Sequence, residues 1–90
     1  MNRVDFVITY DISDPKRLRL IAKTMEQYAF RIQKSIFFYP KASLEDISKL
    51  ILSLSETMDK KEDDIRIYQV DIKKSLSLCS GIDLNHINLI

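Results

Sequence analysis

The sequence of 90 residues predicts a single α+β domain. Two segments place apolar residues at helical spacing, and they alternate with segments in which apolar and polar residues alternate as in strands. The order is strand, helix, a long strand-like stretch, helix and strand, followed by a tail. We expect the domain to cover residues 1–72 and the tail to cover residues 73–90.

The first strand is predicted over residues 3–11, which are apolar enough for the centre of a sheet. One face of this strand carries Val4, Phe6, Ile8 and Tyr10, and the other carries Val7 and Thr9. Asp14 and Pro15 then begin a helix, because aspartate caps free N–H groups and proline has none to leave unpaired. The buried stripe of this helix comprises Leu18, Ile21, Ala22, Met25, Tyr28 and Ala29.

Residues 30–39 are strand-like and contain no strong turn signal. The pattern leaves open whether they form one long strand or two short strands that break near Lys34 and Ser35. Alternation places Phe30, Ile32, Ile36 and Phe38 on one face. The other, more polar face comprises Arg31, Gln33, Ser35, Phe37 and Tyr39.

Ser43 and Asp46 have the spacing of a capping box, which begins a second helix that we expect to end near Met58. A charged loop then leads to a strand over residues 65–72. If the middle segment is two strands, the order is the ferredoxin-like βαββαβ arrangement, an antiparallel sheet with both helices on one face. The open face suits a homodimer, and the tail could add a C-terminal strand to the sheet edge of its own chain or of the partner.

The net charge of +1 conceals an uneven distribution. Residues 16–34 contain six Lys or Arg against one acid, Glu26, whereas residues 43–64 contain seven acids against three lysines. The first region could bind nucleic acid and the second would avoid it. Charge alone favours the simpler explanation, that both helices have solvated charged faces.

Composition excludes several classes of protein and site. Cys79 is the single cysteine, so the chain forms no internal disulfide, which fits a cytoplasmic protein. Asp5 and Thr9 interrupt any signal-peptide core, and no apolar run approaches the ~20 residues that span a membrane. The single glycine, Gly81, excludes a glycine-rich phosphate loop, and His86 has no neighbouring metal ligand.

Asp11 is the most informative residue, because strands disfavour aspartate and this one ends an apolar strand. A role in capping a loop or helix explains an aspartate at this position as well as a role in binding or catalysis does. One chain lacks a second carboxylate for a cation, since Asp14 is expected to be the N-cap. In a twofold dimer Asp11 would meet its copy, and two carboxylates can share a Mg²⁺ ion that keeps most of its waters. Such a metal would polarise a phosphate or activate a water.

Basic and aromatic residues near Asp11 are candidates for nucleic-acid contact. Arg17, Arg19 and Arg31 could bind phosphates, although each alone is more simply a surface charge. Phe37 could stack on a base if it is accessible, although packing in an interface is the more ordinary role. Phe6 and Tyr68 are expected to be core residues.

Four segments together resemble the Cas two family, the small CRISPR-associated adaptation proteins. They are YDISD at 10–14, RLR at 17–19, RIQKSIF at 31–37 and DIRIY at 64–68. Their order and spacing agree with the family over about residues 3–72.

The resemblance implies a homodimer whose sheets pack face to face and whose tail strand adds to the partner's sheet. It implies a role in CRISPR adaptation, or spacer acquisition, in which the dimer bridges two CRISPR integrase dimers and holds spacer-precursor duplex DNA. Several relatives are metal-dependent endonucleases on single-stranded RNA or duplex DNA, and Asp11 matches their catalytic, Mg²⁺-binding residue. The nucleic-acid-binding residues predicted here are Tyr10, Arg17, Arg19, Arg31, Lys34 and Phe37.

Two positions depart from the family. Ala29 stands where a glycine usually ends the first helix at positive φ, and Phe38 stands where an acid is common. Two rival functions remain open: a toxin-type messenger-RNA endonuclease of the same fold, and a non-enzymatic ferredoxin-like module that binds a small ligand or regulates a partner. The sequence also leaves open a scaffold in which Asp11 is structural.

Overall fold

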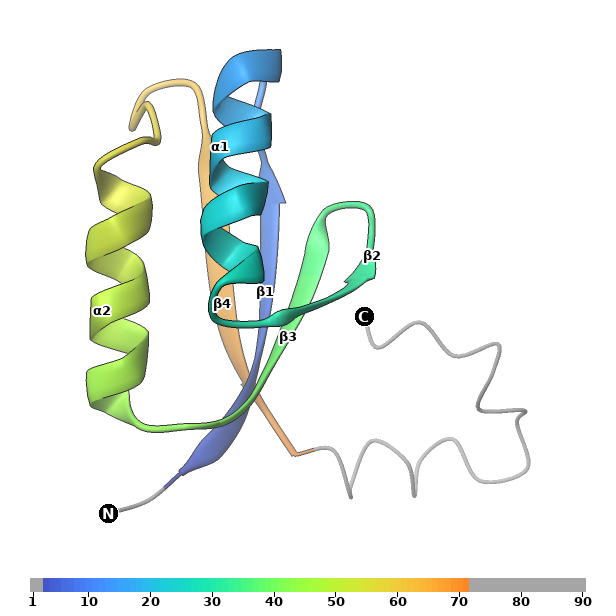
Figure 1. The fold of residues 1–90 in the computed structure, drawn as a ribbon, viewed down its shortest axis with the longest axis vertical. Coiled ribbons are helices and arrows are strands. Elements are labelled where there is room, and N and C mark those ends of the chain that lie inside the picture. Colours follow the sequence, from blue (N-terminus) through green and yellow to red (C-terminus); the bar gives the residue numbers. More distant parts are fainter. Residues whose placement is uncertain (1–2, 72–90) are drawn as a thin grey trace.

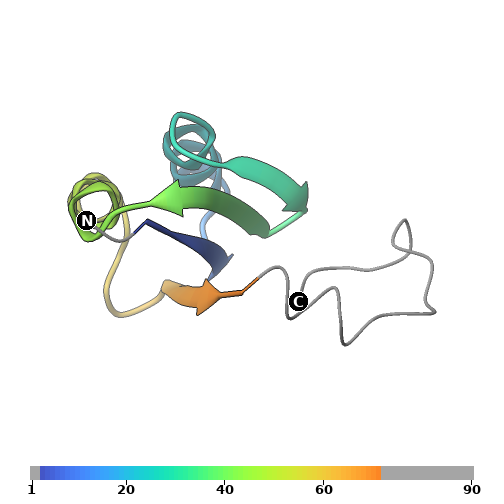
Figure 2. The same cartoon turned by 90° about the horizontal axis from the view of Figure 1, so that it is seen from below.

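The computed structural model describes residues 3–71, which form one antiparallel sheet and two helices (Figure 1). The elements are β1 (Val4–Asp11), α1 (Pro15–Glu26), β2 (Phe30–Gln33), β3 (Ile36–Ala42), α2 (Leu44–Ser55) and β4 (Asp64–Val70). The strand order is β2-β3-β1-β4, and both helices cover the same face of the sheet (Figure 2). The predicted α+β, ferredoxin-like βαββαβ fold is confirmed; the predicted tail strand lies outside the described residues.

Local hydrogen bonds explain where both helices begin. The Asp14 carboxylate accepts the backbone N–H of Arg17 at 2.9 Å, and Pro15 is the first residue of α1. Ser43 and Asp46 form the reciprocal bonds of a capping box at α2. Both predicted starts are confirmed, whereas α2 ends at Ser55, three residues before the predicted end.

The middle segment is two strands, which break at Lys34 and Ser35. Arg31 pairs with Phe37, and a shift of register follows it in β2. The hairpin lies beside the end of β1, where the backbone N–H of Tyr10 donates to the Ser35 carbonyl at 3.1 Å. The pairing therefore carries the residues around this turn to the Asp11 end of the sheet.

The main core lies between the sheet and the two helices. Its buried residues are Ile8, Tyr10, Ile12, Ile21, Met25, Ala29, Phe37, Leu50 and Leu54. Phe6 is buried in a smaller cluster with Ala42 and Ile47, as predicted. Ala29 packs in the main core at negative φ, since Lys41 is the one described non-glycine residue with positive φ. Ala29 therefore does not adopt the left-handed conformation that would be costly for an alanine in place of the family's glycine.

The face of the sheet that the helices leave open carries an apolar row. The strand register aligns Phe30, Phe38, Val7 and Tyr68 across all four strands. Tyr68 is 48% exposed, so its assignment to the core was wrong. It lies on the open face of β4, an edge strand, where neither helix can cover it. Among residues 3–71, no helix is long and apolar enough to cross a membrane.

Candidate nucleic-acid interface and acidic strand end

Asp11 lies exposed at the end of β1, directly opposite Asp64 of β4. Partners in an antiparallel ladder project from the same face, so the two carboxylates share the open face. Arg66 forms an exposed ion pair with Asp64, with 2.9 Å between Arg66 Nε and Asp64 Oδ2. The sequence alone did not identify Asp64 as the neighbour of Asp11, because only the register of β4 on β1 brings them together.

The donor set at this end suits a hard cation that requires few protein ligands. Mg²⁺ binds carboxylate oxygen and is commonly held by one or two carboxylates plus waters. Within residues 3–71, no three Asp, Glu, His or Cys side chains gather as a metal site. A set of one or two carboxylates, such as Asp11 with a carboxylate from a second copy of the chain, would leave the remaining coordination positions to waters or to a phosphate.

A basic pocket of about 190 Å³ lies between α1 and the β2–β3 hairpin. It is lined by Tyr10, Leu18, Arg19, Ala22, Arg31, Lys34 and Ser35. Four of the six predicted nucleic-acid-binding residues are therefore brought together, from three separate elements and a turn. The volume is below the roughly 300–1,000 Å³ typical of small-molecule sites and suits a small anionic group such as phosphate.

The positive charge of this pocket is poorly compensated. Glu26 lies 3.6 Å from Arg31 Nη2, and both side chains are substantially exposed. Within the described part of the chain, neither Arg19 nor Lys34 has an ion-pair partner. Three cations thus face one carboxylate, which leaves a local positive potential for an anion.

Arg19 joins this pocket to a second depression on the outer side of α1. The depression has a volume of about 300 Å³ and is lined by Lys16, Arg19, Leu20 and Lys23. Helical spacing places the three cations on one face of α1. The positive surface therefore extends from the hairpin along the helix, over a length suited to a polyanion.

Tyr10 shapes the floor of the basic pocket. Its hydroxyl donates to the Lys34 carbonyl at 3.3 Å, and its ring stacks on Phe37 at a centroid distance of 6.0 Å. Burial raises the pKa of the Tyr10 phenol further above its ordinary value, so the hydroxyl keeps the proton that it donates to Lys34. Tyr10 therefore supports the hairpin turn that carries Lys34.

Phe37 is fully buried, so the accessible ring on which the predicted base stacking depended is not found in this structure. The face of β3 that looked more polar in the sequence is the face that packs against the helices. The Arg31 guanidinium lies 5.2 Å from the Phe37 ring centroid, within cation–π range. Phe37 thus contributes to the interface indirectly, by holding Arg31.

Arg17, which was also predicted to contact phosphate, does not line the basic pocket. Its Nε donates to Asp63 Oδ2 at 2.8 Å and its Nη2 to Asp63 Oδ1 at 3.1 Å. Nη2 also donates to Glu62 Oε2 at 3.2 Å. The hydrogen bond from Arg17 is the main reason that the pKa of Asp63 is lowered to about 2, so this carboxylate is ionised at neutral pH.

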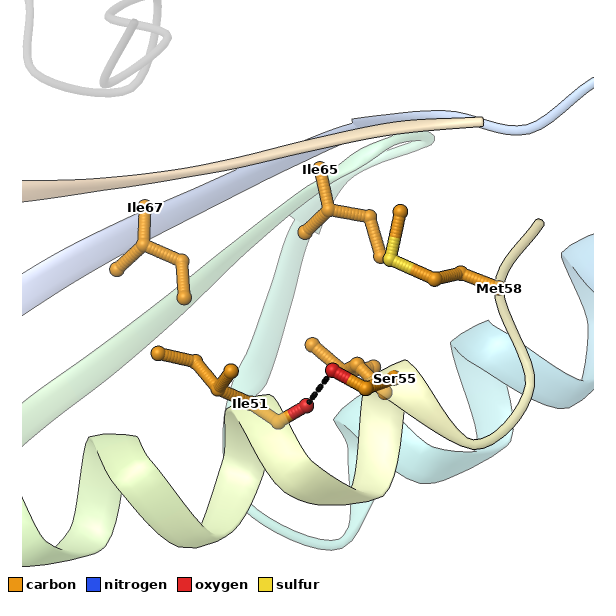
Figure 3. Close-up of a pocket in the computed structure, with 6 residues that line it drawn as sticks. Ile51, Ser55, Met58, Ile65 and Ile67 are labelled. Atoms are coloured by element: carbon orange, nitrogen blue, oxygen red, sulfur yellow. Dashed lines mark hydrogen bonds between the residues drawn. The ribbon is translucent and has the colours of Figure 1, made fainter. Parts of the chain in front are cut away.

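A third hollow, between α2 and the edge strand β4, is apolar (Figure 3). It has a volume of about 280 Å³ and is lined by Ile51, Leu54, Ser55, Met58, Ile65 and Ile67. The Ser55 hydroxyl donates to the Ile51 carbonyl at 2.7 Å within its own helix. The lining thus offers no charged group for binding phosphate or for proton transfer.

Comparison with known proteins identifies the family to which the sequence is similar. The family described as CRISPR associated protein Cas2 matches residues 4–77. The CRISPR-associated endoribonuclease Cas2 1 of Nitrosomonas europaea is 34% identical over 64 residues. That match covers 71% of this chain and 60% of the relative, so the chain spans less than two thirds of that protein's length.

Solved structures share the fold. Streptococcus pyogenes Cas2 is 28% identical with a TM-score of 0.71, over 81% of this chain and 93% of that chain. A chain of a partial Cas6-RT-Cas1–Cas2 complex has a TM-score of 0.69 over 96% of this chain and 90% of that one. Its identity of 20% makes that likeness one of fold alone. Because the family match spans most of the sequence and includes both the Asp11 strand and the basic hairpin, the chain belongs to the CRISPR associated protein Cas2 family.

Proposed function

We propose that this chain is a homodimeric, nucleic-acid-binding subunit of CRISPR adaptation with Mg²⁺-dependent endonuclease activity centred on Asp11. The observation that carries the proposal is the convergence of Arg19, Arg31 and Lys34 on one pocket with a single nearby carboxylate. Cations arranged in this way neutralise phosphates and release their counterions. The endoribonuclease name of the Nitrosomonas relative supports the nuclease part.

The basic surface accounts for binding to the phosphate backbone. Arg31 is held by the Phe37 ring, so little conformational freedom remains to be given up when it binds phosphate. Lys16 and Lys23 extend the track along α1. Phosphate is common to spacer-precursor duplex DNA and to single-stranded RNA, and both are therefore substrates to test.

The open face of the sheet supports the dimer. Its apolar row crosses every strand, and Phe30 and Tyr68 at the two ends of the row are exposed, so covering them with another surface would be favourable. Two copies that pack face to face would bring both Asp11 strand ends to one interface. The tail, residues 73–90, would then extend the β4 edge of its own sheet or of the partner's, with its Ile and Leu residues packing on the sheet.

The paired Asp11 carboxylates would hold the metal in this dimer. Mg²⁺ bound there would supply electrostatic stabilisation of charge on the scissile phosphate. The protein's own part is to hold the backbone with Arg19, Arg31 and Lys34 and to keep Asp64 paired with Arg66. If a cleavage assay shows no activity that depends on Asp11, the chain is instead a scaffold in which Asp11 has no catalytic role.

The proposed setting is cytoplasmic, with the dimer bridging two dimers of the CRISPR integrase. Membership in the CRISPR associated protein Cas2 family supports a setting in CRISPR adaptation. Growth arrest on expression without CRISPR proteins would favour the toxin-type nuclease instead. Absence of nucleic-acid binding would favour a non-enzymatic module.

The test is the salt dependence of nucleic-acid binding by the Arg19→Ala variant. For duplex DNA, the slope of log K against log salt should fall by about 0.9 for each cation that no longer neutralises a phosphate. Lys49→Ala is the matched control, because Lys49 lies on α2 and pairs with Glu45 at 3.7 Å. Equal slopes for Arg19→Ala and Lys49→Ala would contradict the proposed interface.

A further inference from the structure

We infer that Arg17 and Asp63 form a latch that holds the end of β4 against the start of α1 and so positions Asp11 and Asp64. In this inference Arg17 is a positioning residue and contacts no phosphate. The expected effect of the latch on cleavage rests on the proposed function, whereas its expected effect on the stability of the β1–β4 strand end does not.

The latch is a two-point contact with a buried carboxylate. The Asp63 side chain is 0% exposed and that of Arg17 is 23% exposed. The planar guanidinium matches the two carboxylate oxygens, a geometry that lysine cannot reproduce. Removing either partner leaves a buried charge or buried polar atoms uncompensated, so the loss of either side chain should destabilise the contact between α1 and the loop before β4.

The loop before β4 is tied to the same carboxylate. The backbone N–H of Asp59 donates to Asp63 Oδ2 at 2.8 Å, and the N–H of Asp63 donates to the Asp59 carbonyl at 2.8 Å. Asp63 is therefore fixed on both sides, by its own loop and by Arg17. Loss of the Arg17 contact would therefore free the whole loop at residues 59–63 from α1.

The sequence connects this latch directly to the acidic strand end. Asp63 immediately precedes Asp64, the first residue of β4, which pairs with Asp11, the last residue of β1. On the other side, the backbone N–H of Arg17 donates to Asp14, the cap of α1. Arg17 therefore contacts the chain on both sides of the Asp11–Asp64 pair. Its backbone N–H binds Asp14, and its side chain binds Asp63.

Charge repulsion weakens the pairing of β1 and β4 at this end of the sheet, so an additional contact there is stabilising. Two carboxylates placed directly opposite each other destabilise a strand pair. Arg66 offsets part of the repulsion from Asp64, but its side chain and that of Asp64 are mostly exposed. The partly buried Arg17 contact is screened less by solvent and holds the strand ends together.

Amide hydrogen exchange tests the latch without any nuclease assay. Arg17→Met and Asp63→Asn should each raise exchange near the Asp11–Asp64 pair by roughly tenfold or more. The double variant should be no faster than either single variant, because both remove one interaction. Amides near the Asp5–Val70 pair, at the other end of β1 and β4, should change less. Unchanged exchange, or an equal rise at both ends, would overturn the latch.

Nucleic-acid binding separates positioning from phosphate contact. The latch predicts that Arg17→Met keeps the wild-type salt slope, while Arg17→Lys fails to restore slow exchange at the strand end. A direct phosphate contact predicts a slope lower by about 0.9 in Arg17→Met and its recovery in Arg17→Lys. Where the wild type cleaves, the latch variants should show a lower kcat with little change in KM. A wild type that neither binds nor cleaves would refute the proposed function, and exchange alone would then decide the latch.

Discussion

Asp11→Asn should lower Mg²⁺-dependent cleavage at least about 100-fold while nucleic-acid binding stays within about twofold of wild type. The substitution keeps the shape of the side chain but removes the charge that would hold the metal. Binding should persist because the basic pocket opens on the helix-covered side of the sheet, whereas Asp11 lies on the open side. Stability should not fall, since the variant also relieves the repulsion between Asp11 and Asp64.

The measurement is cleavage of RNA and of duplex DNA by purified protein, with Mg²⁺ or with chelator, beside binding at two salt concentrations. Asp5→Asn is the matched control, because Asp5 lies on the same face of β1 at its other end. It accepts the Lys41 N–H at 2.9 Å, a bond that asparagine can also accept. Equal cleavage by Asp11→Asn and wild type would remove Asp11 from the chemistry, and a joint loss of binding would make its role structural.

Phe37→Ala should destabilise the fold by about 3–5 kcal/mol, the usual cost of deleting a fully buried phenylalanine ring. The ring packs on Tyr10 and beneath Arg31, so its removal also loosens the basic pocket. The total stability of a small domain is about 5–15 kcal/mol, so such a change threatens folding itself. Urea unfolding at fixed protein concentration would measure it.

Phe37→Leu is the companion variant for the role of the ring. Leucine keeps the site apolar and should cost less than about 2 kcal/mol, so the protein should fold and bind nucleic acid normally. A folded Phe37→Leu protein that no longer binds would show that the ring contacts a base, contrary to its burial.

Features that depend on neighbouring residues in the sequence were predictable. Asp14 and Ser43 indicate the starts of their helices because capping involves backbone groups two or three residues away. Strand and helix periodicity likewise predicted the order of the elements. The break at Lys34 and Ser35 lacked a glycine or proline signal, and only pairing with β1 and between β2 and β3 settles it.

The roles of the arginines and of Phe37 depended on tertiary structure. Arg17 and Arg19 are two residues apart on α1, which turns them about 200° from each other, toward the loop and toward the pocket respectively. Phe37 and Phe38 are both apolar and point to opposite faces, so alternation alone does not say which face is inside. Asp63 looked like one more acid in a charged loop until the fold brought Arg17 to it.

The most direct test of the proposed dimer is disulfide crosslinking between two copies of Asp11→Cys, in a Cys79→Ser background that leaves no other thiol. Leu44→Cys is the control, because Leu44 is 79% exposed on α2, on the helix-covered side of the sheet. We expect rapid crosslinking of Asp11→Cys into a covalent dimer, with Leu44→Cys remaining uncrosslinked. Crosslinking of Leu44→Cys alone, or of neither variant, would contradict a dimer that pairs the two Asp11 carboxylates.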